Sequence, residues 1–204
     1  MHSGARVTAL WSSQVRADWS AALASYPAVI ALQEVPKLPE LDTWYRNELP
    51  DLIASRRLVH ITLPELIRVT EWKMYRGVWR APNLVRVKSN PAETVIETTV
   101  RGFARTPHPT QAIGEIASLD GVGPATASAI VAAQLPSVYP FFDELVAAQV
   151  PDLGPVKWTL GYYAKYAEFL RTRAASLGAP WTSVMVERAL WASVGGKTGV
   201  TSES

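Results

Sequence analysis

The chain has 204 residues, of which 48% are hydrophobic, and a formal net charge of +2. This length and apolar content suit one large or two small packed domains, and a charge so close to zero does not by itself indicate nucleic-acid binding. The absence of cysteine excludes disulfides and thiolate metal sites. Neither a membrane span nor a signal-peptide pattern is recognisable. We therefore expect a cytoplasmic monomer with no membrane partner.

The first sixty residues are predicted to form an N-terminal helical region (1–60) that packs on the rest. Within it, residues 11–25 and 41–56 have helical composition, and a proline-containing stretch separates them. A helical domain is expected over residues 61–195, followed by a flexible tail (196–204) rich in Gly, Ser and Thr. No segment shows the alternating pattern of a strand, so the predicted fold class is all-α.

Capping signals mark where the helices of the second region begin. Thr62 and Glu65 have the spacing of a capping box, and Gly77 is expected to end the helix that they open. The same spacing recurs at residues 90–93, with proline at the expected first helical position, and predicts a helix that ends near residue 104.

Positive charge is concentrated in the part of the chain that contains these two capping signals. Residues 56–105 contain ten Lys and Arg against four Asp and Glu, a net charge of +6, which favours contact with phosphates or describes a solvated helical surface. Arg76 and Arg80 flank the flexible Gly77, and we predict that they contact phosphate or substrate. Trp72 suits a base-stacking platform or a core anchor, and its apolar ring favours the core.

The segment Leu119–Ala127 predicts two helices joined by a tight, glycine-containing turn, within a hairpin at residues 109–135. Two glycines one residue apart allow close approach of bare backbone to a ligand. Pro124 suits the first position of the second helix, whose N-terminal N–H groups would face an anion. The residues expected to bind DNA at this turn are Gly121, Val122, Gly123, Pro124, Ala125 and Thr126.

An aspartate follows the apolar segment Tyr139–Phe142. Asp143 is the candidate catalytic residue because a carboxylate in water-poor surroundings stabilises developing positive charge. The alternative is that Asp143 only caps the helix that begins there. Glu144 follows directly and leaves open which of the two carboxylates does the chemistry.

The remaining sequence predicts two more helices. One spans residues 158–175, where Trp158, Tyr162, Tyr166 and Phe169 form a stripe at helical spacing that is typical of a core face. The last helix is expected to start after Thr182 or Ser183 and to continue through residue 192.

The hairpin and the aspartate together resemble the helix-hairpin-helix DNA glycosylase superfamily, which includes endonuclease III, the adenine glycosylases and the 8-oxoguanine glycosylases. The resemblance covers roughly residues 109–150. It implies a glycosylase-type all-α fold, double-stranded and damaged DNA as the partner, a catalytic role for Asp143, and a potassium or sodium ion held by turn carbonyls. The matching residues are Leu119, Gly121, Val122, Gly123, Thr126, Ala127, Ile130, Pro140 and Asp143.

Two departures from that family limit the chemistry that the resemblance implies. The position of the lysine nucleophile of its bifunctional members, eighteen residues before the aspartate, is Ala125 here. Alanine offers no amine for a Schiff base. Without cysteine, a four-cysteine iron–sulfur cluster cannot form. No metal site is expected from the three scattered histidines. Adenine glycosylases also lack a lysine at this position.

The expected function is therefore that of a DNA-binding protein and a monofunctional N-glycosylase that removes a modified base without strand cleavage. One alternative is a non-catalytic DNA-binding protein on the same scaffold. A protein–protein adaptor built on the same hairpin is a further alternative.

Overall fold

The computed structural model describes residues 10–201, and all regular structure in this range is helical, so the all-α prediction is confirmed. The helices are α1 (Arg16–Ala31), α2 (Leu38–Thr43), α3 (Leu49–Ala54), α4 (Leu63–Arg76), α5 (Ala81–Lys88), α6 (Ala92–Phe103), α7 (Gln111–Ile116), α8 (Pro124–Gln134), α9 (Glu144–Ala147), α10 (Leu160–Leu177) and α11 (Ser183–Ser193). Short 3-10 turns lie at Leu10–Ser12 (η1) and Pro151–Leu153 (η3), and a π-helical turn at Trp44–Glu48 (η2) joins α2 to α3. No helix in residues 10–201 combines the length and apolarity needed to cross a membrane.

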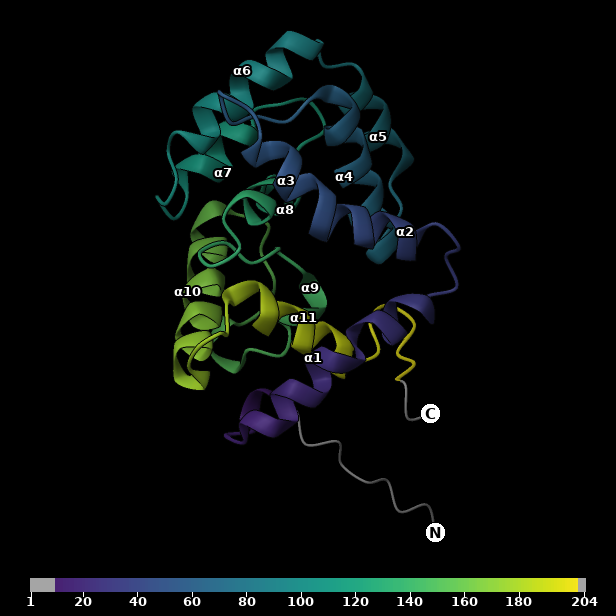
Figure 1. Cartoon of the computed structure of the whole chain (residues 1–204), viewed down its shortest axis with the longest axis vertical. Coiled ribbons are helices and arrows are strands. Elements are labelled where there is room, and N and C mark those ends of the chain that lie inside the picture. The colour runs from purple at the N-terminus through teal and green to yellow at the C-terminus, as the bar shows by residue number, and fades with distance from the viewer. Residues whose placement is uncertain (1–9, 202–204) are drawn as a thin grey trace.

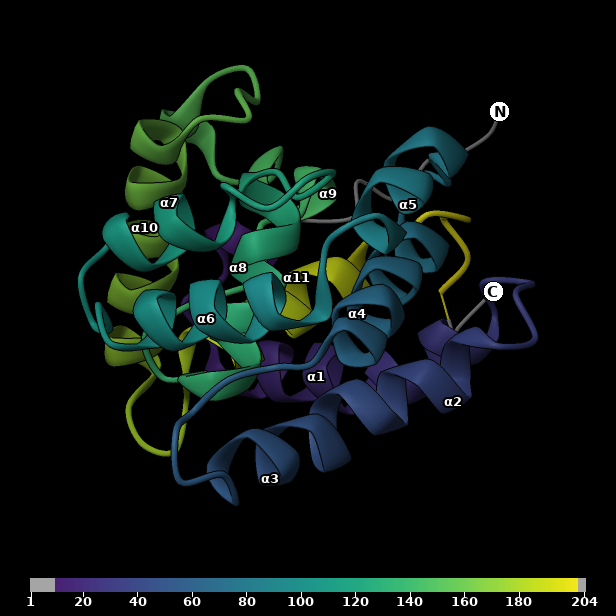
Figure 2. The ribbon, with the colours of Figure 1, turned by 90° about the horizontal axis from the view of Figure 1, so that it is seen from above.

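Helix α8 lies at the centre of the molecule. Its residues 125–133 are all buried, and in Figure 2 the other helices surround it. Five of these nine residues are alanine, so neighbouring helices can approach α8 closely on every side. A helix that is apolar all round must be buried in this way.

The helices form two groups with α8 between them. In Figure 1, α2–α7 occupy one end of the molecule, while α1, α9, α10 and α11 occupy the other. Helix α1 packs along α11, whereas α2 packs on α4 and α3 on α8. The predicted 1–60 region is thus shared between both groups, and its first nine residues lie outside the described range.

Helix α1 starts and ends later than its sequence pattern predicted. It continues through Pro27 to Ala31, although a proline inside a helix removes a backbone hydrogen bond at a cost of roughly 3 kcal/mol. Tyr26, Val29 and Ile30 are buried on the same helix, and α1 packs along α11. Burial of these side chains offsets the local penalty.

The capping box of α4 is confirmed. The Thr62 side chain accepts a hydrogen bond from the Glu65 N–H, and the Glu65 carboxylate accepts one from the Thr62 N–H. The matching prediction at residues 90–93 is wrong at its cap, because the residue before α6 is Pro91. The Asn90 side chain instead binds the backbone of Asp120.

The C-terminal helices begin at side-chain caps. Thr159 caps α10 and Thr182 caps α11. Two hydrogen bonds join Gln33 to the segment around the start of the predicted tail: Gln33 accepts one from the Thr198 N–H (3.2 Å) and donates one to the Gly195 carbonyl (3.1 Å). Residues 202–204 of that tail lie outside the described range.

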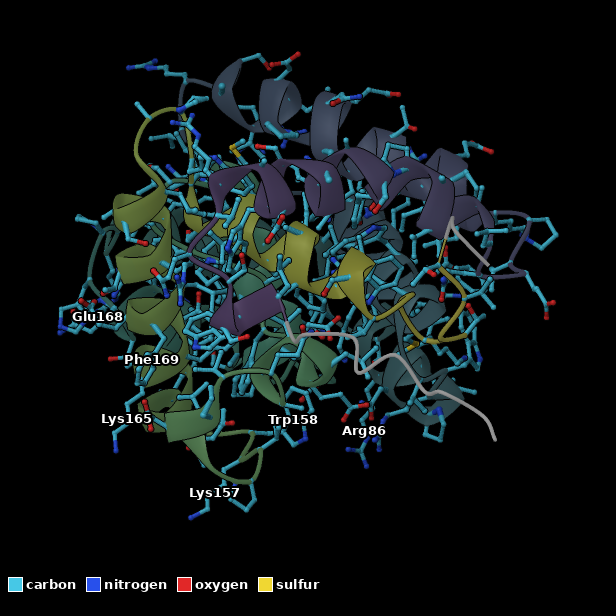
Figure 3. The ribbon with its side chains drawn as sticks, turned by 90° about the horizontal axis from the view of Figure 1, so that it is seen from below. Arg86, Lys157, Trp158, Lys165, Glu168 and Phe169 are labelled. Atoms are coloured by element: carbon cyan, nitrogen blue, oxygen red, sulfur yellow. The ribbon has the colours of Figure 1, made fainter. Side chains whose placement is uncertain are left out.

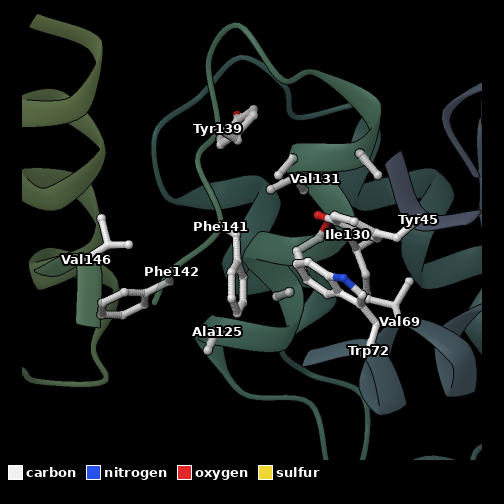
Figure 4. Close-up of a cluster of buried hydrophobic side chains, with 14 of the residues drawn as sticks. Tyr45, Val69, Trp72, Ala125, Ile130, Val131, Tyr139, Phe141, Phe142 and Val146 are labelled. Carbon is white, nitrogen blue, oxygen red and sulfur yellow. The ribbon is translucent and has the colours of Figure 1, made fainter. Parts of the chain in front are cut away.

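The core between α4 and α8 is aromatic (Figure 4). Trp72 is fully buried, as predicted, and stacks on Tyr45 with ring centroids 3.8 Å apart. Phe141 meets the Trp72 ring edge-on at 5.0 Å, while the adjacent Phe142 lies beside Val146 of α9 (Figure 4). The two phenylalanines therefore anchor the chain on opposite sides immediately before Asp143.

The two turn glycines should respond differently to substitution. Gly121 has φ +74°, and a Cβ there would lie 2.6 Å from the Asn83 carbonyl oxygen and 2.8 Å from the Val87 nitrogen. Gly121→Ala should lower the free energy of unfolding by about 1–3 kcal/mol or more. A Cβ at Gly123 meets nothing within 4 Å, and Gly123→Ala should stay within about 0.5 kcal/mol. Urea unfolding of both variants measures this, and equal losses would contradict it.

Candidate nucleic-acid interface and active site

The turn between α7 and α8 is held by its apolar residues. Leu119 and Val122 are buried, and the Val122 N–H donates to the Leu119 carbonyl at 3.0 Å. Gly121 takes the left-handed conformation that its lack of a Cβ allows, and its backbone packs against α5. The turn is therefore a rigid part of the core surface.

Asn90 fixes this turn from outside the hairpin. Its Nδ2 donates to the Asp120 carbonyl at 2.9 Å, and its Oδ1 accepts from the Asp120 N–H at 3.0 Å. Asn90 is buried and also donates to the Val87 carbonyl at 2.9 Å. The side-chain amide of Asn90 thus joins the end of α5 to the turn. The sequence, in which Asn90 precedes Pro91, did not indicate this role.

The N-terminus of α8 has N–H groups without a partner inside the protein. Pro124 occupies the first helical position, and no residue in the range 10–201 accepts a hydrogen bond from the N–H groups of Ala125 or Thr126. These residues line a cavity of about 200 Å³, here named the α8 cavity, together with Lys73, Arg80, Asn83 and Trp158. Free N–H groups and the positive end of the helix dipole favour an anion here.

The strand-like segment before Asp143 is fixed by hydroxyl groups. Tyr163 donates to the Pro140 carbonyl at 3.0 Å, and Tyr166 donates to the Phe141 carbonyl at 2.7 Å. From the other side, the Phe142 N–H donates to Ser128 Oγ of α8 at 2.9 Å. Helices α8 and α10 therefore clamp the backbone that carries the aspartate.

Asp143 is buried, and its two carboxylate oxygens have different partners. Oδ1 accepts from the N–H groups of Leu145 (2.8 Å) and Val146 (3.4 Å), so Asp143 does cap α9. Oδ2 lies 3.8 Å from Nη2 of Arg76. The capping role and a role in a cavity are thus compatible, because they use different atoms.

The prediction that Arg76 contacts DNA is corrected. Its side chain has no exposed surface, and its guanidinium pairs with Glu187 of α11 as well as with Asp143. The guanidinium also lies 4.5 Å from the ring centroid of Trp191 and 5.2 Å from that of Phe141. A cation buried among aromatic rings and carboxylates is a structural partner of Asp143 and is unavailable to a phosphate.

Opposing influences act on the carboxyl of Asp143. Burial raises its pKa, whereas Arg76 and the two α9 N–H groups lower it, and the net direction is upward. The pKa of Glu187 is also raised, again by burial, although Arg76 and Arg46 act against that effect. Burial therefore leaves Asp143 with a proton affinity above that of an exposed aspartate.

Asp143 opens onto a second cavity of about 140 Å³, here named the Asp143 cavity. This space accommodates about five water molecules. Lys73, Arg80 and Trp158 line both this cavity and the α8 cavity, so the two adjoin in one groove. Glu144 also lines the Asp143 cavity but is exposed, whereas Asp143 is the buried carboxylate.

Three residues of the groove were missed or misjudged from the sequence. Trp158 was predicted in the core, yet it precedes α10 and is 46% exposed; with Lys157 and Arg86 it lies along one edge of the molecule (Figure 3). Lys73 was counted only among the basic residues of its segment. Lys197 lines the Asp143 cavity from the C-terminal segment. For Trp158 alone the sequence contained an indication of its place outside α10, namely the turn residues Gly154 and Pro155 shortly before it.

No cluster of three or more His, Asp or Glu residues suited to a metal occurs in residues 10–201. The ion at the turn carbonyls remains a prediction. Comparison with known protein families, with curated proteins and with solved structures finds no match.

Replacing Arg76 tests the buried charge cluster. Arg76→Met should lower the free energy of unfolding by about 3–5 kcal/mol at pH 8, because Asp143 and Glu187 lose their cation. Their folded-state pKa values, already raised, would rise further above those of the unfolded chain. The folded variant then binds more protons than the unfolded chain, so its stability falls as pH rises through this range, and the loss should be smaller at pH 5.

Urea unfolding of Arg76→Met at both pH values measures this loss. Arg80→Met serves as the control, since Arg80 is exposed and its loss should stay within about 0.5 kcal/mol. Equal losses for Arg76→Met at pH 5 and pH 8 would indicate lost packing and would contradict the electrostatic account.

Proposed function

We propose that this protein binds duplex DNA through the α7–α8 turn and removes a modified base by hydrolysis of its N-glycosidic bond, with Asp143 as the catalytic carboxylate. The observation that carries the proposal is the shared groove. A helix N-terminus suited to a phosphate and a cavity containing a buried aspartate are lined by the same Lys73, Arg80 and Trp158. A nucleotide turned out of the duplex needs both, one for its backbone and one for its base.

The phosphate contact follows from the backbone of α8. The unpaired N–H groups of Ala125 and Thr126 bind a phosphate oxygen without reading sequence. Arg80 and Lys73 add positive charge beside them. Gly123 leaves room for this approach, since no atom lies within 4 Å of the place where its Cβ would be.

The chemistry follows from the charge of Asp143. Breaking an N-glycosidic bond builds positive charge on the deoxyribose, and a carboxylate held beside C1′ stabilises that transition state. Asp143 Oδ1 is held by α9, which fixes the group, while Oδ2 remains for the reacting centre or for a water molecule. Burial raises the pKa of this carboxyl, and the charge of Arg76 acts against that effect and favours the ionised form.

A non-catalytic DNA-binding protein is the second candidate. The observation in its favour is the cap on α9, which gives Asp143 a structural reason to be present. Both candidates share the phosphate contact and differ only in base release.

Binding to DNA should be abolished by bulk at Gly123. We expect wild-type affinity for duplex DNA to be independent of sequence and to fall with salt. Gly123→Phe should remove binding because its ring fills the approach to α8, whereas Gly123→Ala should retain most of it. Arg80→Ala should reduce the slope of log affinity against log salt by about 0.9. Fluorescence anisotropy measures each value.

Arg57→Ala is the matched control for the loss of one charge, because Arg57 is exposed and lines neither cavity. Wild-type affinity in a folded Gly123→Phe variant would rule out the turn as the binding site.

Base release should depend on Asp143. Asp143→Asn keeps the cap on α9, because an amide oxygen accepts the same bonds, but it removes the negative charge. Turnover should fall by about 10²–10³-fold with DNA affinity unchanged. Glu144→Gln, at the exposed neighbour, should retain most of the activity. Single-turnover assays on duplexes with different modified bases, followed by alkali, measure abasic-site formation.

The wild-type rate should rise with pH through an ionisation above the ordinary aspartate value of 3.8, since the pKa of Asp143 is raised. Tight DNA binding without base release from any duplex in the panel would favour the non-catalytic candidate.

A further inference from the structure

We propose that Lys73 is a second reactive group of this site, whose amine attacks C1′ of an abasic deoxyribose and cleaves the strand by β-elimination. This inference rests on the proposed function, because it takes the groove to be a DNA site. The sequence has Ala125 where bifunctional glycosylases have a lysine, and it therefore predicted base removal that leaves the DNA strand intact. Lys73 supplies an amine to the same space from a different helix.

Packing aims Lys73 at the groove. Its neighbours on α4, Trp72 and Met74, are buried, with 0% and 1% of their surfaces exposed. They fix the rotation of the helix about its axis, and Lys73 lines the Asp143 cavity and the α8 cavity. It therefore borders the places proposed for the sugar and for the phosphate.

Lys73 also has no partner that would hold it as a structural cation. It is half-buried, and no ion pair or hydrogen bond joins its amine to any residue in the range 10–201. Arg76, one turn later, holds the carboxylates of Asp143 and Glu187. The amine of Lys73 is therefore not held by a structural contact and is available to a nucleotide bound in the groove.

The electrostatics of the groove favour the neutral amine. Burial lowers the pKa of Lys73, and the charge of Arg80 lowers it further, while Asp143 and Glu144 act in the opposite direction. Only the unprotonated amine is a nucleophile, and a lysine beside another cation in a desolvated site is activated in this way.

The reaction balances without any oxidant or metal. The Nζ lone pair of Lys73 forms a bond to C1′ of the ring-opened aldehyde. The carbonyl oxygen takes one proton from the amine and one from the Asp143 carboxyl and leaves as water, giving an iminium. The carboxylate of Asp143, in the same cavity, accepts a proton from C2′. The electrons of that C–H bond form a C=C bond, and the C3′–O bond breaks with loss of the phosphate. Hydrolysis of the iminium regenerates Lys73.

A duplex containing a preformed abasic site tests this step separately from base removal. Incubation of the whole 204-residue chain with this duplex and borohydride should give a covalent protein–DNA adduct, and peptide mapping should locate it at Lys73. Without borohydride, a denaturing gel should show strand cleavage without alkali. Lys73→Arg should abolish both signals while retaining DNA affinity, because a guanidinium stays protonated.

Lys157→Arg is the matched control, because Lys157 is exposed and lines neither cavity, and it should retain the adduct. Mapping of the wild-type adduct to another lysine, or no adduct at all, would overturn the inference whether or not a Lys73 variant folds. Adduct formation at Lys73 without base release from any modified duplex would refute the proposed glycosylase and leave Lys73 as a lyase. Base release without adduct formation would do the reverse.

Discussion

A chain of alternating charges inside the molecule holds the candidate site together. Asp42 of α2 pairs with Arg46 at 3.3 Å, Arg46 lies 4.0 Å from Glu187 of α11, and Glu187 pairs with Arg76 of α4, whose other partner is Asp143 at 3.8 Å. Burying any one of these charges alone would cost several kcal/mol, roughly, so each requires its neighbours. The chain crosses both helix groups, and its last two members, Arg76 and Asp143, line the Asp143 cavity. The position and protonation of that aspartate therefore depend on the packing of four elements.

The same chain explains why Asp143 differs from an ordinary helix cap. Arg46 shares Glu187 with Arg76, and Tyr26 and Trp72 both donate to Asp42 at the closed end. These contacts pair the interior charges and keep the Arg76 side chain in place at the cavity, although Arg76 Nε and Nη1 and Glu187 Oε2 have no hydrogen-bond partner among residues 10–201. An exposed cap needs no such support. Burying the carboxylate of Asp143 costs free energy, and a helix cap alone does not require that burial. Under the proposed function the burial has a purpose, because perturbed carboxylates are typical of reacting groups.

Local rules recovered the parts of this structure that local interactions determine. The cap at Thr62, the turn glycines and the start of α11 depend on residues within four positions of one another, and sequence spacing contains that information. Arg76 was misplaced because its partner Glu187 is 111 residues away. Tyr166 belonged to a stripe that was assigned to the core, correctly for its ring. The sequence gives no sign of the backbone carbonyls to which the hydroxyls of Tyr163 and Tyr166 donate. The sequence therefore identified candidate residues of the site, but not the long-range contacts that position them.

Trp158 shows what the groove adds to the turn and the aspartate considered separately. Its ring packs against the ring of Phe142, with centroids 4.7 Å apart, and 46% of the Trp158 surface is exposed. Phe142 directly precedes Asp143, so the ring that supports Trp158 and the carboxylate lie on the same short segment. Under the proposed function, a base that stacks on Trp158 would place its sugar toward Asp143 and Lys73, and its phosphate toward α8. Stacking tolerates any base because every base has a π-face. Selectivity for a modified base must then come from the polar groups of the Asp143 cavity, of which Arg80, Glu144 and Lys197 are exposed.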